Sequence, residues 1–414
     1  MKNWVDEDAC PVVFKEILFR AAERAGVEWT CHDIRAPAAR SARRDDALNG
    51  HFRWRAGAAA ALLAIVSAPA VATDIVAELG LRAADEPVRQ MAGWAPEGPI
   101  VVGVNSSERL ARLQEAAGDT PLIGVYDEAE ALAAMPRATA LLGFCTRELI
   151  DAAPKLHWIQ VFWAGVEDCV AELRASKRDL LLTNMQRVTS AQIAEHVMGM
   201  LLAFTRGLAP HIRAQHSGEW NPNLVPISAR PALNGKTLLL VGLGGIGTAI
   251  ARRAHGFDMR ITAVRASGRP GPDYVAEVAG PDQLLRLAAE ADVVVNSVPI
   301  TDATAGMFDA RFFAAMKPTA YFFNVGRGRS VVTADLVAAL EAGELAGAGL
   351  DVVDPEPLPA HHPLWRMPNV IITPHVAARS DESFARVFRV LRENLRRYVN
   401  GEAMLSVVDV ERGY

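Results

Sequence analysis

The stretch KTLLLVGLGGIGTAIARRA, residues 236–254, decides the fold of this 414-residue chain. An apolar run at 237–241 is typical of a buried strand, and an apolar helical pattern follows the glycines. In a GxGxxG turn the first glycine permits the tight bend, the second lets the backbone approach a pyrophosphate, and the third lets helix and strand pack closely. The start of the helix also offers free N–H groups to phosphates. This context favours a dinucleotide site over an ordinary glycine-rich turn, and we expect the site to include Gly242, Gly244, Gly245, Ile246 and Gly247.

Short apolar runs of strand type alternate with helical patterns on both sides of this stretch. The upstream runs lie at 100–104, 138–144 and 156–162, and the downstream runs at 259–264, 291–298, 320–325, 348–353 and 370–374. Helical patterns cover 190–216 and 381–399. The alternation predicts an α/β fold with two Rossmann-like doubly wound domains. We expect a substrate-binding domain at 96–187 plus 378–414, a dinucleotide-binding domain at 188–377, and an irregular N-terminal extension at 1–95.

The composition excludes several classes of protein. The net charge is -5 and there is no basic run, which argues against nucleic acid and anionic membranes as partners. The alanine-rich run at 56–72 contains Pro69 and is too short for a membrane span. The cysteines form no CxxC pair and no His-rich cluster, so we expect no metal site and read them as reduced thiols of a cytoplasmic protein. They are Cys10, Cys31, Cys145 and Cys169.

The residues after the second strand of the dinucleotide-binding unit indicate the cofactor. An NAD enzyme usually places Asp or Glu there for the ribose 2′-hydroxyl. This chain has Arg265 and Ser267 instead, and its next carboxylate is Asp273. Because a guanidinium group favours a phosphate by charge and by paired hydrogen bonds, we predict NADP, with NAD possible if Arg265 only stacks on the adenine.

Three polar residues follow three predicted strands of the same sheet, where ligands bind in such folds. Arg327 supplies a planar set of donors for a carboxylate or a carbonyl oxygen. His375 can donate a proton near neutral pH, and Glu356 can hold its tautomer. Each residue alone could be a surface arginine, a loop carboxylate or a packed histidine. Their matching positions after three strands favour a catalytic set for reducing a keto acid.

The motifs GLGGIG, NVGRG, LDVVDPEP and TPHVA, in this order, resemble the D-isomer-specific 2-hydroxyacid dehydrogenases over about residues 99–414. The resemblance implies that Arg327, Glu356 and His375 are catalytic and that Asp351 bonds the nicotinamide carboxamide. It implies further cofactor contacts at Val298, Pro299, Thr304, Val325 and Gly326. The substrate carboxylate would rest on backbone N–H groups of Gly143, Phe144, Trp163, Ala164 and Gly165. Trp163 would either restrict substrate size or pack at a domain interface.

The resemblance also indicates the reaction. We expect a cytoplasmic homodimer that reduces glyoxylate or hydroxypyruvate with NADPH and oxidises the matching D-2-hydroxy acids. A phosphoglycerate dehydrogenase-like NAD enzyme and a non-catalytic dinucleotide-sensing corepressor are the alternatives. Glu356 argues against formate dehydrogenase, in which a glutamine is usual at this place.

Residues 1–27 resemble the start of a small uncharacterised bacterial family related to PIN-like nucleases, with Asp6 and Asp8 at its acidic positions. A metal-dependent nuclease needs further carboxylates from distant strands, and residues 31–84 match neither family. We therefore expect a catalytically inactive fusion or frameshift remnant, with the original dehydrogenase start near Met91.

Overall fold

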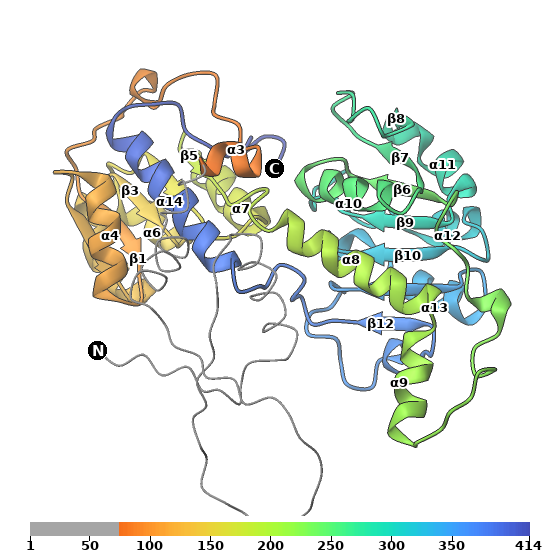
Figure 1. The fold of residues 1–414 in the computed structure, drawn as a ribbon. Coiled ribbons are helices and arrows are strands. Elements are labelled where there is room, and N and C mark those ends of the chain that lie inside the picture. The colour runs from red at the N-terminus through yellow and green to blue at the C-terminus, as the bar shows by residue number, and fades with distance from the viewer. Residues whose placement is uncertain (1–73) are drawn as a thin grey trace, which may run out of the picture. The chain divides into compact units, whose positions relative to one another are not determined.

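The computed structural model describes residues 74–414, and the chain divides into two units, Met1–Asp74 and Ile75–Tyr414. The PIN-like start, the alanine-rich run, Cys10 and Cys31 lie outside the described residues. The second unit contains two parallel sheets, each covered by helices on both faces (Figure 1). The expected α/β fold with Rossmann-like domains is therefore confirmed.

The first sheet has five parallel strands in the order β2-β1-β3-β4-β5. They are β1 (Ile100–Gly103), β2 (Leu122–Val125), β3 (Ala140–Leu142), β4 (Trp158–Gln160) and β5 (Leu181–Thr183). Successive side chains serve opposite faces, as strand geometry requires. Val101, Leu141 and Ile159 pack toward α5 (Glu128–Ala134), α6 (Arg147–Ala152) and α7 (Glu167–Ser176). Ile100, Leu142 and Trp158 pack toward α4 (Ser107–Ala117) and α14 (Ser383–Val399).

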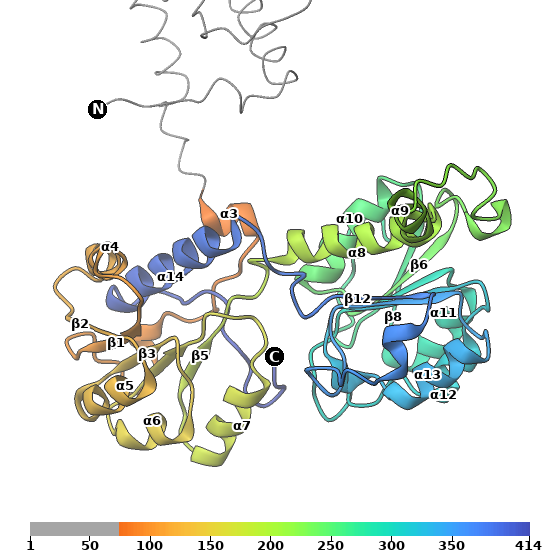
Figure 2. The ribbon, with the colours of Figure 1, turned by 90° about the horizontal axis from the view of Figure 1, so that it is seen from below.

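The segment just before β1 packs into this same core. Figure 2 shows the short helix α3 (Ile75–Leu79) beside α14. Ile75, Leu81 and Val88 are buried in the cluster that contains α14 and Trp158. The predicted extension includes these residues, but their burial makes them part of the substrate-sheet core. A dehydrogenase that begins near Met91 would lack these three buried side chains, and that start stays a prediction.

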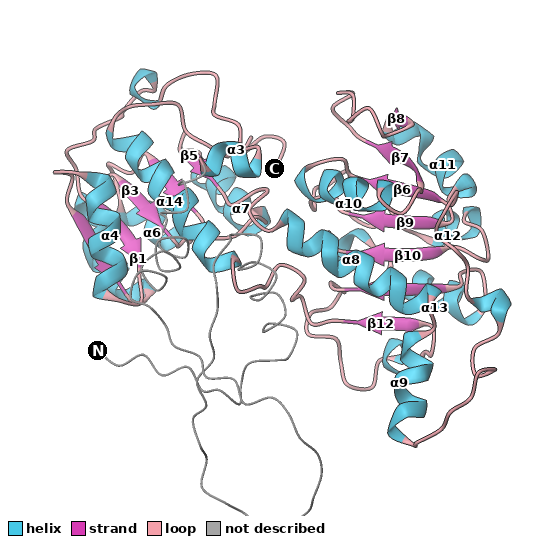
Figure 3. Cartoon of the chain, in the orientation of Figure 1, coloured by secondary structure: helices cyan, strands magenta, loops and turns pink. Residues whose placement is uncertain are grey.

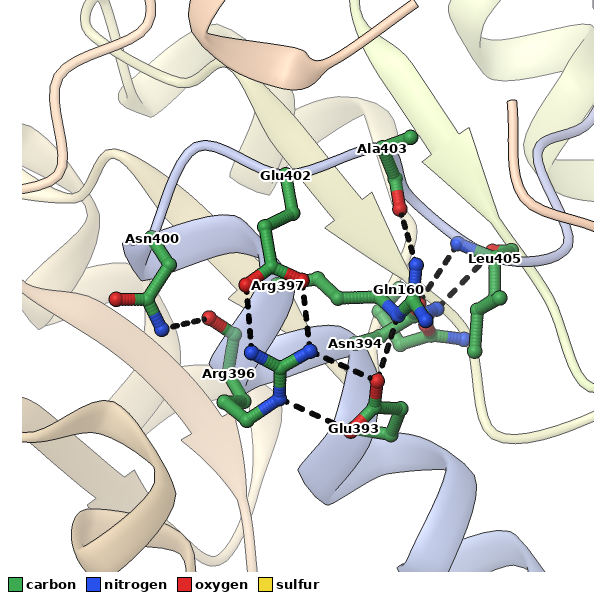
Figure 4. Close-up of polar contacts among 9 residues, drawn as sticks. All are labelled: Gln160, Glu393, Asn394, Arg396, Arg397, Asn400, Glu402, Ala403 and Leu405. Atoms are coloured by element: carbon green, nitrogen blue, oxygen red, sulfur yellow. Dashed lines mark hydrogen bonds and ion pairs between the residues drawn. The ribbon is translucent and has the colours of Figure 1, made fainter. Parts of the chain in front are cut away.

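A buried amide network fixes the end of α14 to the sheet (Figure 4). Asn394 is fully buried, and its Nδ2 donates to Oε1 of Gln160 at 2.8 Å and to the carbonyl oxygen of Leu405 at 3.1 Å. Arg396 lies at the surface of the same turn and bonds both Glu393 and Glu402. Thus the C-terminal helix and tail belong structurally to the first sheet, although they follow the second sheet in sequence.

The second sheet has seven parallel strands in the order β12-β11-β10-β9-β6-β7-β8 (Figure 3). They are β6 (Thr237–Val241), β7 (Arg260–Val264), β8 (Glu277–Ala279), β9 (Val293–Asn296), β10 (Tyr321–Asn324), β11 (Gly347–Leu350) and β12 (Val370–Ile372). The strand order reverses direction between β6 and β9. Doubly wound sheets bind ligands at such a switch point, outside the carboxyl ends of the strands. The glycine loop follows β6 directly, so it lies at that point.

Both faces of this sheet are covered by helices. Leu238 and Leu240 pack with α8 (Ser190–Thr205) and α10 (Gly245–His255) on one face. Leu239 and Val241 pack on the other face with α11 (Leu284–Glu290), α12 (Ala310–Ala315) and α13 (Thr333–Glu341). A strand that is apolar on both sides reads as a continuous apolar run, which explains the sequence LLLV.

The structure differs from the sequence prediction in a few elements. The helix expected at 190–216 is two helices, α8 and α9 (Leu208–His216), because Gly207 adopts a φ of 65° between them. The short strands β2, β5 and β8 were not expected. No helix among the described residues is long and apolar enough to cross a membrane.

Candidate active site

The glycine loop has the geometry that a dinucleotide requires. Gly242 has a φ of 98°, which favours glycine, and its N–H donates to the carbonyl oxygen of Val264 at 3.0 Å. A β-carbon at Gly247 would lie 2.1 Å from the carbonyl oxygen of Gly242, so helix α10 could not approach the strand with any larger residue. A β-carbon at Gly244 would meet nothing within 4 Å. The loop is therefore closed by Gly242 and Gly247 and open at Gly244, where the backbone is free to face a phosphate.

A buried amide and hydroxyl network positions Arg327 after β10. Asn296 Nδ2 donates to Asn324 Oδ1 at 2.8 Å and to Ser330 Oγ at 2.7 Å. Asn324 Nδ2 and Ser330 Oγ both donate to the carbonyl oxygen of Arg327, at 3.1 and 2.6 Å. Since all three polar side chains are at most 1% exposed, the network fixes the backbone of Arg327. A β-carbon at Gly328 would lie 1.8 Å from the carbonyl oxygen of Val353, so the residue after the arginine must be glycine.

The guanidinium group of Arg327 is bound to a carboxylate that sequence analysis missed. Its Nε donates to Glu167 Oε1 at 2.5 Å, and its Nη1 donates to the carbonyl oxygen of Gly326 at 2.8 Å. Its Nη2 has no hydrogen-bond partner among residues 74–414. Burial would raise the pKa of Glu167, but the hydrogen bond and charge of Arg327, with a smaller contribution from His375, hold that pKa below its ordinary value. Glu167 is therefore hydrogen-bonded to Arg327, and the charge of His375 acts on it more weakly.

His375 and Glu356 form a hydrogen-bonded pair. Nδ1 of His375 lies 3.0 Å from Oε2 of Glu356, whose Oε1 accepts from the N–H of Val353 at 3.0 Å. The histidine and glutamate side chains are 52% and 39% exposed, so the pair is open to solvent. His375 adopts a φ of 53°, an uncommon conformation for a residue other than glycine, and such strain is concentrated at functional sites. Nε2 of His375 has no hydrogen-bond partner in the described part of the chain and is free to meet a substrate.

Asp351 holds the turn that carries His375. Its Oδ1 accepts from the hydroxyl of Thr373 at 2.7 Å and from the N–H of Val376 at 2.9 Å, and its Oδ2 accepts from the N–H of Ala377 at 3.1 Å. Thr373 Oγ1 also lies 2.8 Å from Nε2 of His196, on α8. Asp351 is only 4% exposed, so positioning this turn is a role that the structure itself supplies.

Arg265 and Ser267 lie after β7, where the sequence predicts contacts with the adenosine part of the cofactor. Nη1 of Arg265 donates to the carbonyl oxygens of Arg269 and Pro270, at 3.2 and 3.0 Å, and its Nη2 donates to that of Leu243. The hydroxyl of Ser267 accepts from Nε of Arg269 at 3.3 Å. Arg265 therefore ties the glycine loop to the loop after β7, and no carboxylate lies between residues 265 and 269.

Comparison with known proteins places this geometry in a family. The model of the D-isomer specific 2-hydroxyacid dehydrogenase NAD-binding domain matches residues 198–377. A glyoxylate reductase of Thermofilum pendens is 35% identical over 265 residues, which are 64% of this chain and 78% of that protein.

Two solved structures are also similar. A D-isomer specific 2-hydroxyacid dehydrogenase family protein from Aeromonas salmonicida is 33% identical, with a TM-score of 0.66 over 76% of this chain and 99% of that one. An NADPH-dependent glyoxylate/hydroxypyruvate reductase from Sinorhizobium meliloti, in complex with NADP and sulfate, is 27% identical, with a TM-score of 0.66 over 77% and 100%. This chain belongs to the D-isomer specific 2-hydroxyacid dehydrogenase family. It is an oxidoreductase, and the resemblance that the four motifs indicated is confirmed.

The loops predicted to line the cofactor in this dehydrogenase have clear internal structure. The N–H of Val298 donates to Oδ1 of Asn296 at 3.1 Å. The hydroxyl of Thr304 donates to the carbonyl oxygen of Pro299 at 2.7 Å and accepts from the N–H of Thr301 at 2.8 Å. Thr304 therefore shapes the loop. Val325 is 6% exposed and packs in the core, and its N–H donates to the carbonyl oxygen of Asn296 at 3.1 Å.

The predicted substrate loops lie beside the first sheet. Gly143 has a φ of 99°, and a β-carbon there would lie 2.7 Å from the ring of Phe162. The ring of Phe144 packs on Gly103 in the same way. Trp163 is 48% exposed, and Asn184 Nδ2 donates to the carbonyl oxygen of Ala164 at 2.7 Å.

Gly165 brings one of these loops to the catalytic arginine. A β-carbon at Gly165 would lie only 1.5 Å from Nη2 of Arg327. The loop at 163–165 therefore lies next to Arg327, and the role of both in substrate binding stays a prediction. No other predicted substrate residue has such a close approach to the arginine among the contacts described above.

The cysteine interpretation is wrong for two of the four residues. Cys145 and Cys169 form a disulfide across 24 residues, with their α-carbons 5.4 Å apart. The bond joins the loop that follows Gly143 to helix α7, which carries Glu167 at its first residue. Spacing alone could not reveal this pair, because the fold brings together two cysteines with no sequence motif between them.

A cavity of about 740 Å³ extends from Glu167 toward the loop after β7. Its lining includes Glu167, Ser267 and Thr301, together with Tyr414 at the end of the C-terminal tail. The cavity therefore connects the carboxylate beside Arg327 with the loop predicted to hold the adenosine.

Proposed function

We propose that this dehydrogenase reduces small 2-keto acids, with glyoxylate and hydroxypyruvate as the first candidates, and uses NADPH as the reductant. The reverse reaction would oxidise the matching D-2-hydroxy acids. The observation that carries the proposal is the hydrogen bond between His375 and Glu356, whose atoms lie 3.0 Å apart. Arg327 and His375 also both lower the pKa of Glu167.

Each catalytic side chain has a role that its surroundings support. Arg327 would bind the carboxylate and carbonyl oxygen of the keto acid through Nη2, which has no hydrogen-bond partner among residues 74–414, and through donors that it would release from Glu167. His375 would deliver a proton from Nε2 to the carbonyl oxygen, while Glu356 holds Nδ1 and stabilises the charged ring. The substrate carboxylate would also meet backbone N–H groups near Gly165.

The residues present suit a nicotinamide dinucleotide. The open backbone at Gly244 and the N-terminus of α10 would hold the diphosphate, and the family resemblance gives Asp351 the nicotinamide carboxamide. When bound, NADPH would supply the hydride that reduces the carbonyl carbon. NADPH is favoured over NADH because arginine and serine, and no carboxylate, follow β7. The similar reductase from Sinorhizobium meliloti is named as NADPH-dependent, which supports the same choice.

We further propose that the protein works in the cytoplasm as a homodimer joined through its nucleotide-binding domain. From the sequence we propose a nucleotide-binding domain at 188–377 and a substrate-binding domain at 96–187 plus 378–414, against which the segment with Ile75, Leu81 and Val88 packs. A hydrodynamic mass of twice the chain mass supports the dimer. A monomer at working concentration contradicts it.

The reaction is tested with purified enzyme, NADPH or NADH, and a series of 2-keto acids of increasing size. Loss of reduced-nicotinamide absorbance that needs both NADPH and a keto acid supports the proposal. Tight binding of cofactor with no turnover of any keto acid would favour the corepressor-like alternative. His375→Gln is the matched control, because it removes the proton donor and leaves cofactor contacts in place.

A further inference from the structure

Four arginines from three separate segments act on one another beside the glycine loop. Arg82 follows α3, Arg187 lies between β5 and α8, and Arg265 and Arg269 follow β7. Burial, and then the charges of Arg82 and Arg269, lower the pKa of Arg187. Burial, and then the charges of Arg269, Arg82 and Arg187, lower the pKa of Arg265. Within residues 74–414 no carboxylate forms an ion pair with any of the four, so the cluster keeps its positive charge.

The backbone of Arg187 adopts a conformation that arginine rarely takes. Its φ is 70°, in the left-handed region that favours glycine. A β-carbon at Gly245 would lie 2.7 Å from Cγ of Arg187, and one at Gly80 would lie 3.7 Å from its Nη1. The side chain therefore passes over the first residue of α10 and reaches toward the turn before Arg82. A residue other than glycine keeps a left-handed backbone only when the surrounding structure holds it there. Such strained residues occur often at ligand sites.

Most of the donors of Arg265 are already used by the loop that carries it. Both of its terminal nitrogens donate to backbone carbonyl oxygens, those of Leu243, Arg269 and Pro270. Arg82 and Arg187 make no side-chain hydrogen bond within the described residues, and Arg269 uses only Nε, toward Ser267. Among the described residues, the guanidinium groups with the most free donors are thus those of Arg82, Arg187 and Arg269.

We propose that Arg187 and Arg82, together with Arg269, bind the 2′-phosphate of NADP, while Arg265 holds the loop on which that phosphate rests. The proposal rests on the proposed use of NADP(H). A phosphate monoester carries close to two negative charges, which offset the mutual repulsion of the arginines. Its oxygens accept paired hydrogen bonds from guanidinium groups. Arg82 is next to Ala83, which forms an isolated β-bridge with Leu405. Arg187 lies in the segment that follows β5 of the first sheet. The cofactor's 2′-phosphate would therefore join the segment around the first sheet to the loop after β7.

Calorimetric titration tests this assignment without using catalysis. NADPH, NADH and adenosine 2′,5′-bisphosphate are titrated into the wild type, Arg187→Gly, Arg187→Gln, Arg82→Gln and the Arg82→Gln/Arg187→Gln double variant. Glycine suits the left-handed backbone, so Arg187→Gly removes the guanidinium group without adding strain. Arg137→Gln, at an exposed arginine with no side-chain hydrogen bond within the described residues, is the control.

We expect each variant to weaken NADPH and the bisphosphate roughly tenfold or more, the scale of a charge-assisted hydrogen bond. NADH affinity should change less than twofold, and Arg137→Gln should change nothing. An equal loss for NADPH and NADH would overturn the inference, because the arginines would then serve the diphosphate. Unchanged NADPH affinity in the variants, with a wild type that prefers NADPH, would overturn the inference and leave the proposed function intact. A wild type that does not prefer NADPH would overturn both.

Discussion

Gly165 faces the guanidinium group of Arg327 so closely that an alanine there tests the site directly. A β-carbon at position 165 would lie 1.5 Å from Nη2 and 2.7 Å from Cζ of Arg327, and 2.9 Å from Oε2 of Glu167. Non-bonded carbon and nitrogen atoms need roughly 3.5 Å, so the guanidinium group must move about 2 Å. We therefore expect Gly165→Ala to displace the arginine from its place beside the substrate loop.

The expected cost falls on catalysis and not on stability. A misplacement of about 1 Å at a reacting site can reduce the rate on the order of 100-fold, so kcat/KM for a keto acid should fall at least that far, about 2.7 kcal/mol. The atoms that must give way are the ends of two flexible, partly exposed side chains. Their ion pair contributes about 0–1 kcal/mol, so the free energy of unfolding should change by no more than that.

Steady-state kinetics with NADPH and glyoxylate, together with urea unfolding, measure the two effects separately. Gly199→Ala is the matched control, because a β-carbon at Gly199 in α8 meets nothing within 4 Å. That control should keep full activity and gain about 0.5–1 kcal/mol of stability. A kcat/KM for Gly165→Ala within tenfold of the wild type would refute the placement of Arg327 at the substrate. So would a loss of activity that merely follows a loss of folded protein.

Three other changes give further tests. A chain that starts at Asp74 should unfold cooperatively. One that starts at Met91 loses the burial energy of three aliphatic side chains, about 5–9 kcal/mol, and should not fold stably. Equal urea midpoints for the two chains would contradict this packing. Cys145→Ser/Cys169→Ser should lower the free energy of unfolding by about 3 kcal/mol under non-reducing conditions and by nothing in excess dithiol, and an equal loss in both would show that the effect is not the disulfide. Arg327 holds the pKa of Glu167 below its ordinary 4.5, so the stability from this pair is present above pH 4.5 and is lost as the pH falls through the lower, folded-state pKa. Glu167→Gln should therefore flatten the acid limb of a plot of unfolding free energy against pH. An unchanged acid limb would argue against the pair.

Local patterns predicted the parts of this protein that depend on neighbours in sequence. The glycine loop, most strands of the second sheet and the positions of Arg327, Glu356 and His375 after strands all follow from short motifs. Strands β2, β5 and β8 were missed because each is only three or four residues long and lacks a distinct alternating pattern. Gly207 was a visible signal for the break between α8 and α9, since a glycine in a helical pattern often marks an end.

The contacts that join distant segments were beyond the reach of sequence patterns. Glu167 lies 160 residues from Arg327, and no spacing rule connects them. The disulfide and the approach of Arg187 to the turn before Arg82 depend in the same way on how separate segments around the first sheet fold together. Asn296 and Asn324 end neighbouring parallel strands, and that register could have predicted their pairing.

The burial of residues 75–90 shows a further limit of motif reading. The family motifs begin later in the chain, so this segment was grouped with the extension. Its apolar residues nevertheless complete the core under α14. A search for apolar residues alone could not tell this segment from the alanine-rich run before it.

The central claim is that Arg327, Glu356 and His375 act together to reduce a 2-keto acid with NADPH. The most direct measurement follows reduced-nicotinamide absorbance with glyoxylate or hydroxypyruvate, for the wild type and for His375→Gln. The account predicts NADPH oxidation well above that with NADH in the wild type, and a loss of at least 100-fold in the variant with NADPH affinity retained. NADPH binding without turnover in the wild type, or turnover that survives His375→Gln, would contradict it.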